Sequence, residues 1–169
     1  NNAAGIIANV AMFEENGIAL PEDWDSFIAA CDAFVEKGIT PIGLTLKDGA
    51  DCARNILLGD YVPGEEIKAV SAGDKKLSET DFPKSVDDLT KIYSYANDKA
   101  ISSDYNTGLT DFANEESAMF LSGNWTFASI RGINPDIKIE QFPLPSSAGR
   151  GYICSGVDVG YTIGANTKY

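Results

Sequence analysis

The hydrophobic positions of residues 23–38 repeat with the period of an α-helix. The apolar side chains fall on one stripe, at Trp24, Phe27, Ile28, Cys31, Phe34 and Val35. Spacings of three and four residues predict a helix with one buried face. Asp23 is a suitable N-cap, Asp25 places negative charge in the first turn, and Gly38 suits the residue that follows the last turn. We therefore expect a helix that begins after Asp23 and ends before Gly38.

Elsewhere the apolar runs are shorter, and strands alternate with helices. The pattern predicts strands at residues 5–9, 40–46, 118–121, 137–142 and 155–163. It predicts helices at residues 50–58, at 86–96 with Ser85 as the cap, at 110–116, and at 123–131 with Ser122 as the cap and Gly132 as the closing residue. A helical turn is expected to follow the first strand and to stop at Asn16-Gly17. Residues 60–81 show no strong period, which predicts a surface excursion with one helical turn at 65–70. Strands separated by helices indicate an α/β domain, in which ligands gather at the ends of the strands.

Composition and charge exclude several classes of function. The chain has 169 residues, 25 acidic and 13 basic side chains, a formal charge of −12 and no histidine. This length fits one domain, and the acidic balance argues against nucleic-acid partners. Without histidine, Ser–His triads and His-based zinc sites are excluded, and we expect no metal or cofactor. The cysteines Cys31, Cys52 and Cys154 lie far apart without metal-binding spacing, so their redox state is left open.

Trp125 is the first candidate for ligand binding. If Ser122 caps a helix that begins near Gly123, a rotation of about 100° per residue turns Trp125 away from the packed positions Phe127 and Ile130. An exposed indole on a first helical turn, with free backbone N–H groups nearby, suits a flat ligand with an apolar face and hydroxyl groups. A sugar ring meets that description. The alternative is that Trp125 fills a small satellite of the core.

Two aspartates are further candidates. Asp158 lies in an apolar, Gly-rich predicted strand, and Asp48 follows the strand predicted at residues 40–46. A carboxylate accepts hydrogen bonds from two adjacent hydroxyls, as sugar sites require. Each aspartate could instead bond its own backbone at a strand end or turn. Asn9 could bond either a neighbouring loop or a ligand.

Several segments, taken in order, resemble one known family. They are residues 9–18 (NVAMFEENGI), 20–27 (LPEDWDSF), 38–42 (GITPI), 118–125 (AMFLSGNW) and 142–145 (FPLP). Together they resemble the middle section of the extracellular solute-binding proteins of sugar ABC importers, the group that includes maltose-binding protein. Three positions depart from that pattern: Ala8 and Val10 stand where the family often has tyrosine and lysine, and Asp23 stands where it often has a threonine cap.

The resemblance implies a periplasmic-binding-protein type II lobe, with a central mixed sheet flanked by helices. Residues 1–169 would form a single α/β lobe, most of the C-terminal lobe of a two-lobed protein. Segments before residue 1 and after residue 169 would supply the first lobe. The crossings between the lobes are expected near residues 1–5 and 155–160.

The resemblance also implies a function, which is to capture a sugar or oligosaccharide between the lobes and deliver it to ABC permease subunits. The protein would be no enzyme, and would be extracellular or periplasmic and lipid-anchored. The binding positions of the family match Trp125 as the aromatic platform, with Asn124 beside it. They also match Asp158 as a polar contact and Asp48 or Ala50 as another contact. An isolated lobe should bind sugar no more tightly than about millimolar, since closure needs both lobes.

Two other classes of function remain as alternatives. One is a small carboxylate-dependent, glycosidase-like enzyme that uses Asp48 and Asp158 as its acid and base. The spacing of these two carboxylates across a closed pocket would identify it. The other is a structural interaction module.

Overall fold

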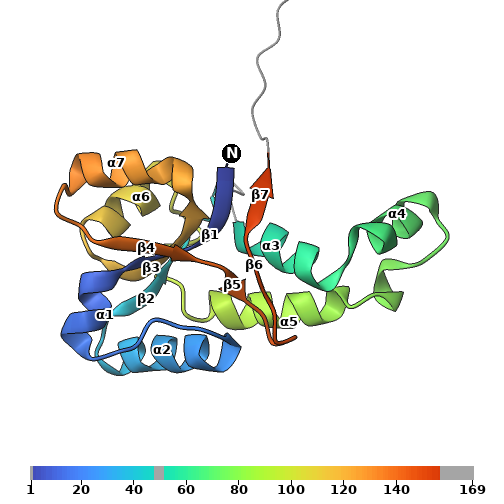
Figure 1. Cartoon of the computed structure of the whole chain (residues 1–169), viewed down its shortest axis with the longest axis horizontal. Coiled ribbons are helices and arrows are strands. Elements are labelled where there is room, and N and C mark those ends of the chain that lie inside the picture. Colours follow the sequence, from blue (N-terminus) through green and yellow to red (C-terminus); the bar gives the residue numbers. More distant parts are fainter. Residues whose placement is uncertain (1, 48–51, 157–169) are drawn as a thin grey trace, which may run out of the picture.

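The computed structural model describes residues 2–47 and 52–156, and at its centre lies one mixed β-sheet (Figure 1). Its strands are β1 (Asn2–Asn9), β2 (Thr40–Gly43), β3 (Ser117–Gly123), β4 (Ile139–Phe142) and β7 (Cys154–Gly156). β1 is antiparallel to β3 on one side and to β4 and β7 on the other. β2 is parallel to β3 at the outer edge. The mixed sheet expected from the resemblance is therefore present.

Helices cover both faces of this sheet (Figure 1). The described α-helices are α1 (Val10–Asn16), α2 (Trp24–Glu36), α3 (Cys52–Tyr61), α4 (Gly64–Ala72), α5 (Phe82–Tyr93), α6 (Tyr105–Ala113) and α7 (Phe127–Ile133), and the 3₁₀ turns are η1 (Leu77–Glu79) and η2 (Asn124–Thr126). Side chains alternate along each strand, so that β1 and β3 contribute to two cores. Ile7 and Phe120 pack with α6 and α7, and Phe120 stacks on Phe112 with ring centroids 5.7 Å apart. Ile6 and Met119 face the opposite way, into the larger core with α2, α3 and α5.

The helix expected between Asp23 and Gly38 is confirmed as α2, with the caps that the sequence indicates. The Asp23 carboxylate accepts a hydrogen bond from the Ser26 amide at 2.8 Å, and the Ser26 hydroxyl accepts one from the Asp23 amide at 3.0 Å. At the other end Gly38 has a φ of +72°, which suits glycine because it has no Cβ. The buried face of α2 is narrower than the apolar pattern predicts, because the side chain of Val35 is 53% exposed.

Other element boundaries also differ from the prediction. β2 ends at Gly43 rather than at residue 46, because the Leu44 amide donates to the Asn97 side chain at 2.9 Å and the chain leaves the sheet. The segment 60–81 is mainly helical, since α3 continues to Tyr61 and α4 fills residues 64–72. No residue of α4 is buried, which explains its weak hydrophobic period.

The next two helices also begin earlier than expected. α5 begins at Phe82, so Ser85 is not its cap; the Ser85 hydroxyl donates to the Phe82 carbonyl inside the helix. α6 covers residues 105–113 because Asp104 caps it, accepting from the Thr107 amide at 2.9 Å. It ends before Glu115, whose φ of +64° cannot continue a helix.

The prediction of a helix capped by Ser122 is wrong. β3 continues to Gly123, whose backbone pairs with Ala4 of β1, and the turn η2 follows before α7 begins at Phe127. Gly132 lies within α7 rather than closing it, because the helix runs to Ile133. Strand pairing with β1 thus overrides the local capping signal. The predicted last strand is described only up to residue 156, as β7.

The hairpin of β5 (Leu144–Pro145) and β6 (Gly151–Tyr152) leads the chain into β7, and polar contacts fix it to α3 and α5. Arg150 donates from Nε to the buried Asp60 carboxylate at 2.9 Å and from its guanidinium to the Asp60 carbonyl at 3.1 Å. The buried Asp88 carboxylate accepts from the Tyr61 hydroxyl at 2.6 Å and from the Ser147 amide at 2.9 Å. These bonds hold the hairpin that leads into β7 against α3 and α5.

Asn9 bonds neighbouring chain segments. It is fully buried at the end of β1, where Oδ1 accepts from the Met12 amide and caps α1, while Nδ2 donates to Glu115 Oε1. We expect Asn9→Ala to lower the free energy of unfolding by about 1–2 kcal/mol, because the variant loses a helix cap and a partly buried hydrogen bond. Urea denaturation measures this loss. Asn106→Ala, on the exposed side of α6, is the control and should cost less than about 0.5 kcal/mol. Equal losses in the two variants would contradict the assigned role of Asn9.

Candidate functional site

A cavity of about 310 Å³ lies at one end of the sheet. β3 ends and β1 begins at this cavity, and residues of α3 and β7 line it as well. Figure 1 shows α3 and β7 close to the start of β1. The polar and aromatic residues that line the cavity are Asn2, Cys52, Asn55, Trp125, Cys154 and Ser155. The carboxyl ends of the parallel strands β2 and β3 lie at this edge, where α/β sheets usually bind ligands. We refer to it as the Trp125 cavity.

Trp125 lies in η2, directly after β3, with 41% of its surface exposed. Its ring covers Gly123: a Cβ at Gly123 would come within 2.0–2.4 Å of three ring carbons. Trp125 also hydrogen-bonds Tyr105, the first residue of α6. Burial raises the pKa of the Tyr105 phenol, and the hydrogen bond from Trp125 offsets part of that rise. The indole is thus held at an edge and a face, and its remaining surface is open to the cavity.

Asn124 joins the site to the start of β1. Its side-chain oxygen accepts a hydrogen bond from the Ala3 amide at 3.1 Å. This contact ties the end of β3 to the first residues of β1, so Asn124 has a positioning role whatever else it binds. Its predicted contact with a ligand stays a prediction.

Two cysteine side chains lie on the wall formed by α3 and β7. Cys154 is exposed and Cys52 is half-buried, and both line the Trp125 cavity although they are far apart in the sequence. The third thiol, Cys31, is buried in the larger core, as expected for its position on the apolar face of α2. Burial and the nearby Asp32 carboxylate raise the pKa of Cys31 to about 12.

The predicted site residues are only partly placed by the structure. Trp125 is exposed and lines the same cavity as Gly156, at the beginning of the Gly-rich last segment. Asp48, Ala50 and Asp158 fall outside the described residues, so their contribution to the site stays a prediction. The separation of the two aspartates, which was to identify the enzyme alternative, falls outside them as well.

Other residues at the site carry no signal in the sequence. Asn2 precedes the expected first strand, Asn55 lies in a helix of weak period, and Tyr105 precedes the helix as predicted. Cys154 and Ser155 join the cavity only because β7 pairs with β1 in the register Ala4–Cys154 and Ala3–Ser155. Local pattern cannot reveal a cavity that is built by the pairing of distant strands.

The described residues were also compared with the requirements of a membrane-spanning helix and of a metal site. Within residues 2–47 and 52–156, no helix combines the length and the apolar character needed to cross a membrane. In the same ranges no three or more acidic, cysteine or histidine side chains gather where they could hold a metal ion.

Comparison with known proteins gives consistent results. The sequence model of the family described as bacterial extracellular solute-binding protein matches residues 1–169. A multiple sugar-binding protein of Streptococcus mutans is 26% identical over 193 residues, an alignment that covers 99% of this chain and 42% of that protein. The chain therefore spans less than half the length of this relative.

Solved structures with the same fold include two of RafE. The apo form of RafE from Streptococcus pneumoniae is 27% identical, with a TM-score of 0.74, and the match covers 99% of this chain and 45% of RafE. The complex of RafE with raffinose is 25% identical, with a TM-score of 0.64, and the match covers 90% of this chain and 42% of RafE. This likeness confirms the predicted class of fold.

Proposed function

Because this chain belongs to the bacterial extracellular solute-binding proteins, we propose that it forms the carbohydrate-binding lobe of a sugar-capturing protein. The protein that contains it would lie outside the cell membrane and hold a sugar or oligosaccharide between two lobes. It would deliver this sugar to ABC permease subunits in the membrane. A lipid anchor would keep it near the membrane. The half-exposed indole of Trp125 in its cavity is the observation that carries this proposal.

The physical argument begins with the indole. The axial C–H groups of a pyranose form an apolar face, and its hydroxyls point outward around the ring. An aromatic surface can cover the apolar face while polar groups bond the hydroxyls. Trp125 offers such a surface, and its contacts with Gly123 and Tyr105 fix the orientation of the ring before a sugar arrives.

Hydrogen-bonding groups surround this surface. Asn2 and Asn55 carry amides, and Ser155 carries a hydroxyl, all on the wall of the same cavity. Amides and hydroxyls both donate and accept, which matches the mixed demands of sugar hydroxyls. We propose that Asp158, and Asp48 or Ala50, add contacts of the same kind.

Closure of a second lobe would complete the site. A sugar that contacts both lobes stabilises only the closed arrangement, so binding shifts the protein toward that state. We propose crossings between the lobes near residues 1–5 and 155–160, on the two strands that begin or end beside Trp125. Their position would let closure bring the other lobe over the indole.

An enzyme is the alternative of another class, with Asp48 and Asp158 as acid and base. The described wall of the Trp125 cavity carries amides, thiols, a hydroxyl and an indole, which are groups for stacking and hydrogen bonding rather than for acid–base work. The relatives are binding proteins by name. We therefore favour capture over catalysis. An exposed aromatic inside a cavity likewise fits a small ligand better than a flat interaction module.

Gly123→Ala tests the proposal with a small change. The φ of Gly123 is −130°, which alanine adopts freely, so the effect comes from the contact of the new methyl group with the Trp125 ring. We expect the displaced ring to weaken oligosaccharide binding by the full-length protein about tenfold, or about 1.4 kcal/mol. Calorimetric titration measures this change, with raffinose as the first probe and a panel of oligosaccharides of two to four units beside it.

The matched control is Gly132→Ala. A Cβ there meets nothing within 4 Å, and the residue lies within α7. Affinity should be unchanged, and the free energy of unfolding should rise by about 0.5–1 kcal/mol, because alanine favours the helix. If both variants bind as the parent does, the Trp125 cavity is not the sugar site. If no oligosaccharide binds to the parent protein, the proposed function fails.

A further inference from the structure

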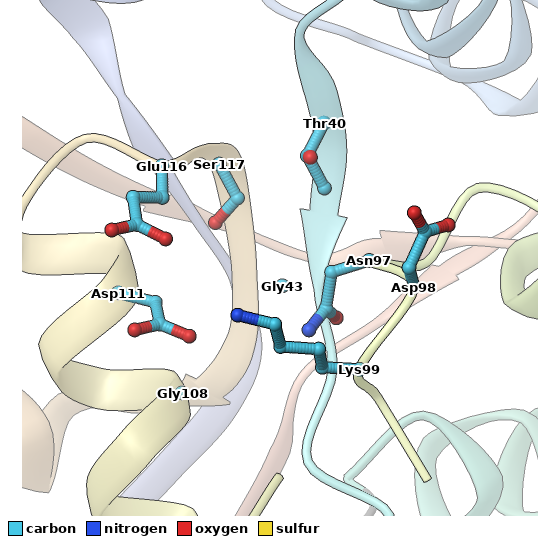
Figure 2. A pocket seen from close by; sticks show the side chains of 9 residues that line it. All are labelled: Thr40, Gly43, Asn97, Asp98, Lys99, Gly108, Asp111, Glu116 and Ser117. Carbon is cyan, nitrogen blue, oxygen red and sulfur yellow. The ribbon is translucent and has the colours of Figure 1, made fainter. Parts of the chain in front are cut away.

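A second cavity, of about 130 Å³, lies between β2, β3, α6 and residues 97–99 (Figure 2). It shares no lining residue with the Trp125 cavity. Its lining includes Thr40, Lys99, Asp111, Glu116 and Ser117. None of these residues has a part in the proposed capture of sugar.

A buried hydroxyl at this cavity has no hydrogen-bond partner among the described residues. Ser117, the first residue of β3, is 3% exposed, and its Oγ is unpartnered. The missing side chain of Gly43 leaves the space in front of it, because a Cβ there would lie 2.8 Å from Oγ. Figure 2 shows the hydroxyl directed into the cavity. Buried polar groups are nearly always satisfied, so the hydroxyl indicates a bound species.

Two carboxylates share the wall beside this hydroxyl. Asp111 is half-buried in α6 and Glu116 directly precedes Ser117, and Figure 2 shows both side chains on one side of the cavity. A backbone hydrogen bond of 3.0 Å from Glu116 to Asp111 holds the two residues together. Within the described part of the chain neither carboxylate takes part in an ion pair.

We propose that this cavity binds Ca²⁺, through the carboxylates of Asp111 and Glu116 and the hydroxyl of Ser117. All three donors are hard oxygens, which Ca²⁺ prefers, and Ca²⁺ tolerates irregular geometry and water ligands. The formal charge of −12 on the chain favours a cation. With only two carboxylates, the dissociation constant should fall near the weak extracellular range of about 10⁻⁴–10⁻³ M. The proposal is independent of sugar binding.

Lys99 gives this proposal a distinctive consequence. Figure 2 shows its side chain reaching across Gly43 toward Asp111 and Glu116. The residue is exposed, and no ion pair within the described residues holds its ammonium group. A Ca²⁺ ion that enters the cavity would have to displace the ammonium group of Lys99. Removing the lysine charge should therefore strengthen the binding of Ca²⁺, whereas it would weaken the binding of an anion or a zwitterion.

Calorimetric titration of CaCl₂ into the full-length protein tests the proposal, with ionic strength held constant by KCl. We expect saturable binding to the parent protein, at least tenfold weaker binding to Asp111→Asn and to Glu116→Gln, and about threefold weaker binding to Ser117→Ala. Lys99→Gln should bind at least threefold more tightly. The thermal unfolding midpoint should rise with CaCl₂ in the parent and in Lys99→Gln, and not in Asp111→Asn.

Glu15→Gln is the control, since it removes one exposed acidic charge at the end of α1. Its Ca²⁺ affinity should equal that of the parent. Four results would overturn the proposal: no saturable binding up to 10 mM CaCl₂, an equal loss of affinity in Glu15→Gln and Asp111→Asn, weaker binding in Lys99→Gln, or unchanged binding in Asp111→Asn and Glu116→Gln. The first result would leave a water molecule as the partner of Ser117.

Discussion

We expect Trp125→Ala to weaken binding of the cognate oligosaccharide by about thirtyfold, or about 2 kcal/mol, in the full-length protein. The variant removes the stacking surface while leaving Gly123 and the pairing of β3 with β1 in place. Because the side chain is half-exposed and outside both core clusters, stability should change little. Calorimetry gives the affinity and urea denaturation gives the stability.

Two further variants separate stacking from general damage. Trp125→Phe keeps an aromatic face and should recover part of the lost affinity. Trp24→Phe is the control, because Trp24 lies on α2, packs near Phe27 with ring centroids 5.9 Å apart and lines a different cavity. Its affinity should match that of the parent. Unchanged binding in Trp125→Ala would refute the role of the indole, even if the protein still bound sugars elsewhere.

The second large effect concerns the thiols. In the native protein at pH 8, we expect a maleimide dye to label Cys154 at least a thousandfold faster than Cys31. Burial raises the pKa of Cys31 to about 12 from an ordinary 9.0, so about a thousandfold less thiolate is present, and the side chain has no exposed surface. Cys154 is exposed. A Cys52→Ser background leaves only these two thiols in the chain, and mass spectrometry of peptides follows each rate.

The same labelling reports on the Trp125 cavity. A bulky dye on Cys154 should fill the space beside Trp125 and abolish sugar binding, and saturating sugar should slow the labelling of Cys154 by at least tenfold. The rate at Cys31 in 6 M urea, where the chain is unfolded, is the internal reference for the reactivity of the dye. If labelled protein binds sugar normally, the Trp125 cavity and the sugar site are different places.

Local signals in the sequence were sufficient to predict an element where the contacts that define it lie within one segment of the chain. The stripe of α2, its capping box and Gly38 all lie within one segment, so the period and the caps could be predicted together. The strand at residues 137–142 was recognisable in the same way, and β4 covers 139–142. The helix expected after Ser122 failed because the competing bonds come from β1, more than a hundred residues away.

Trp125 is an instructive case. The sequence pattern predicts that Trp125 lies on the first turn of a helix that begins near Gly123, whereas it lies in a 3₁₀ turn after a longer strand. Its exposure was nevertheless predicted, because the packed positions Phe127 and Ile130 fix which side of the segment faces the core. The contacts that orient the indole, with Gly123 and Tyr105, needed the fold.

The amino-acid sequence alone determined the class of fold, the resemblance to sugar-binding proteins and the exposed indole, because each depends on local residue patterns and on the order of those patterns along the chain. Only the tertiary structure placed Cys52, Cys154 and Asn2 around that indole, and only it left the Ser117 hydroxyl without a partner beside Asp111 and Glu116. The physical reason is the register of the sheet: β1 pairs with three strands from the far end of the chain, and no local period encodes which residues those pairings bring together.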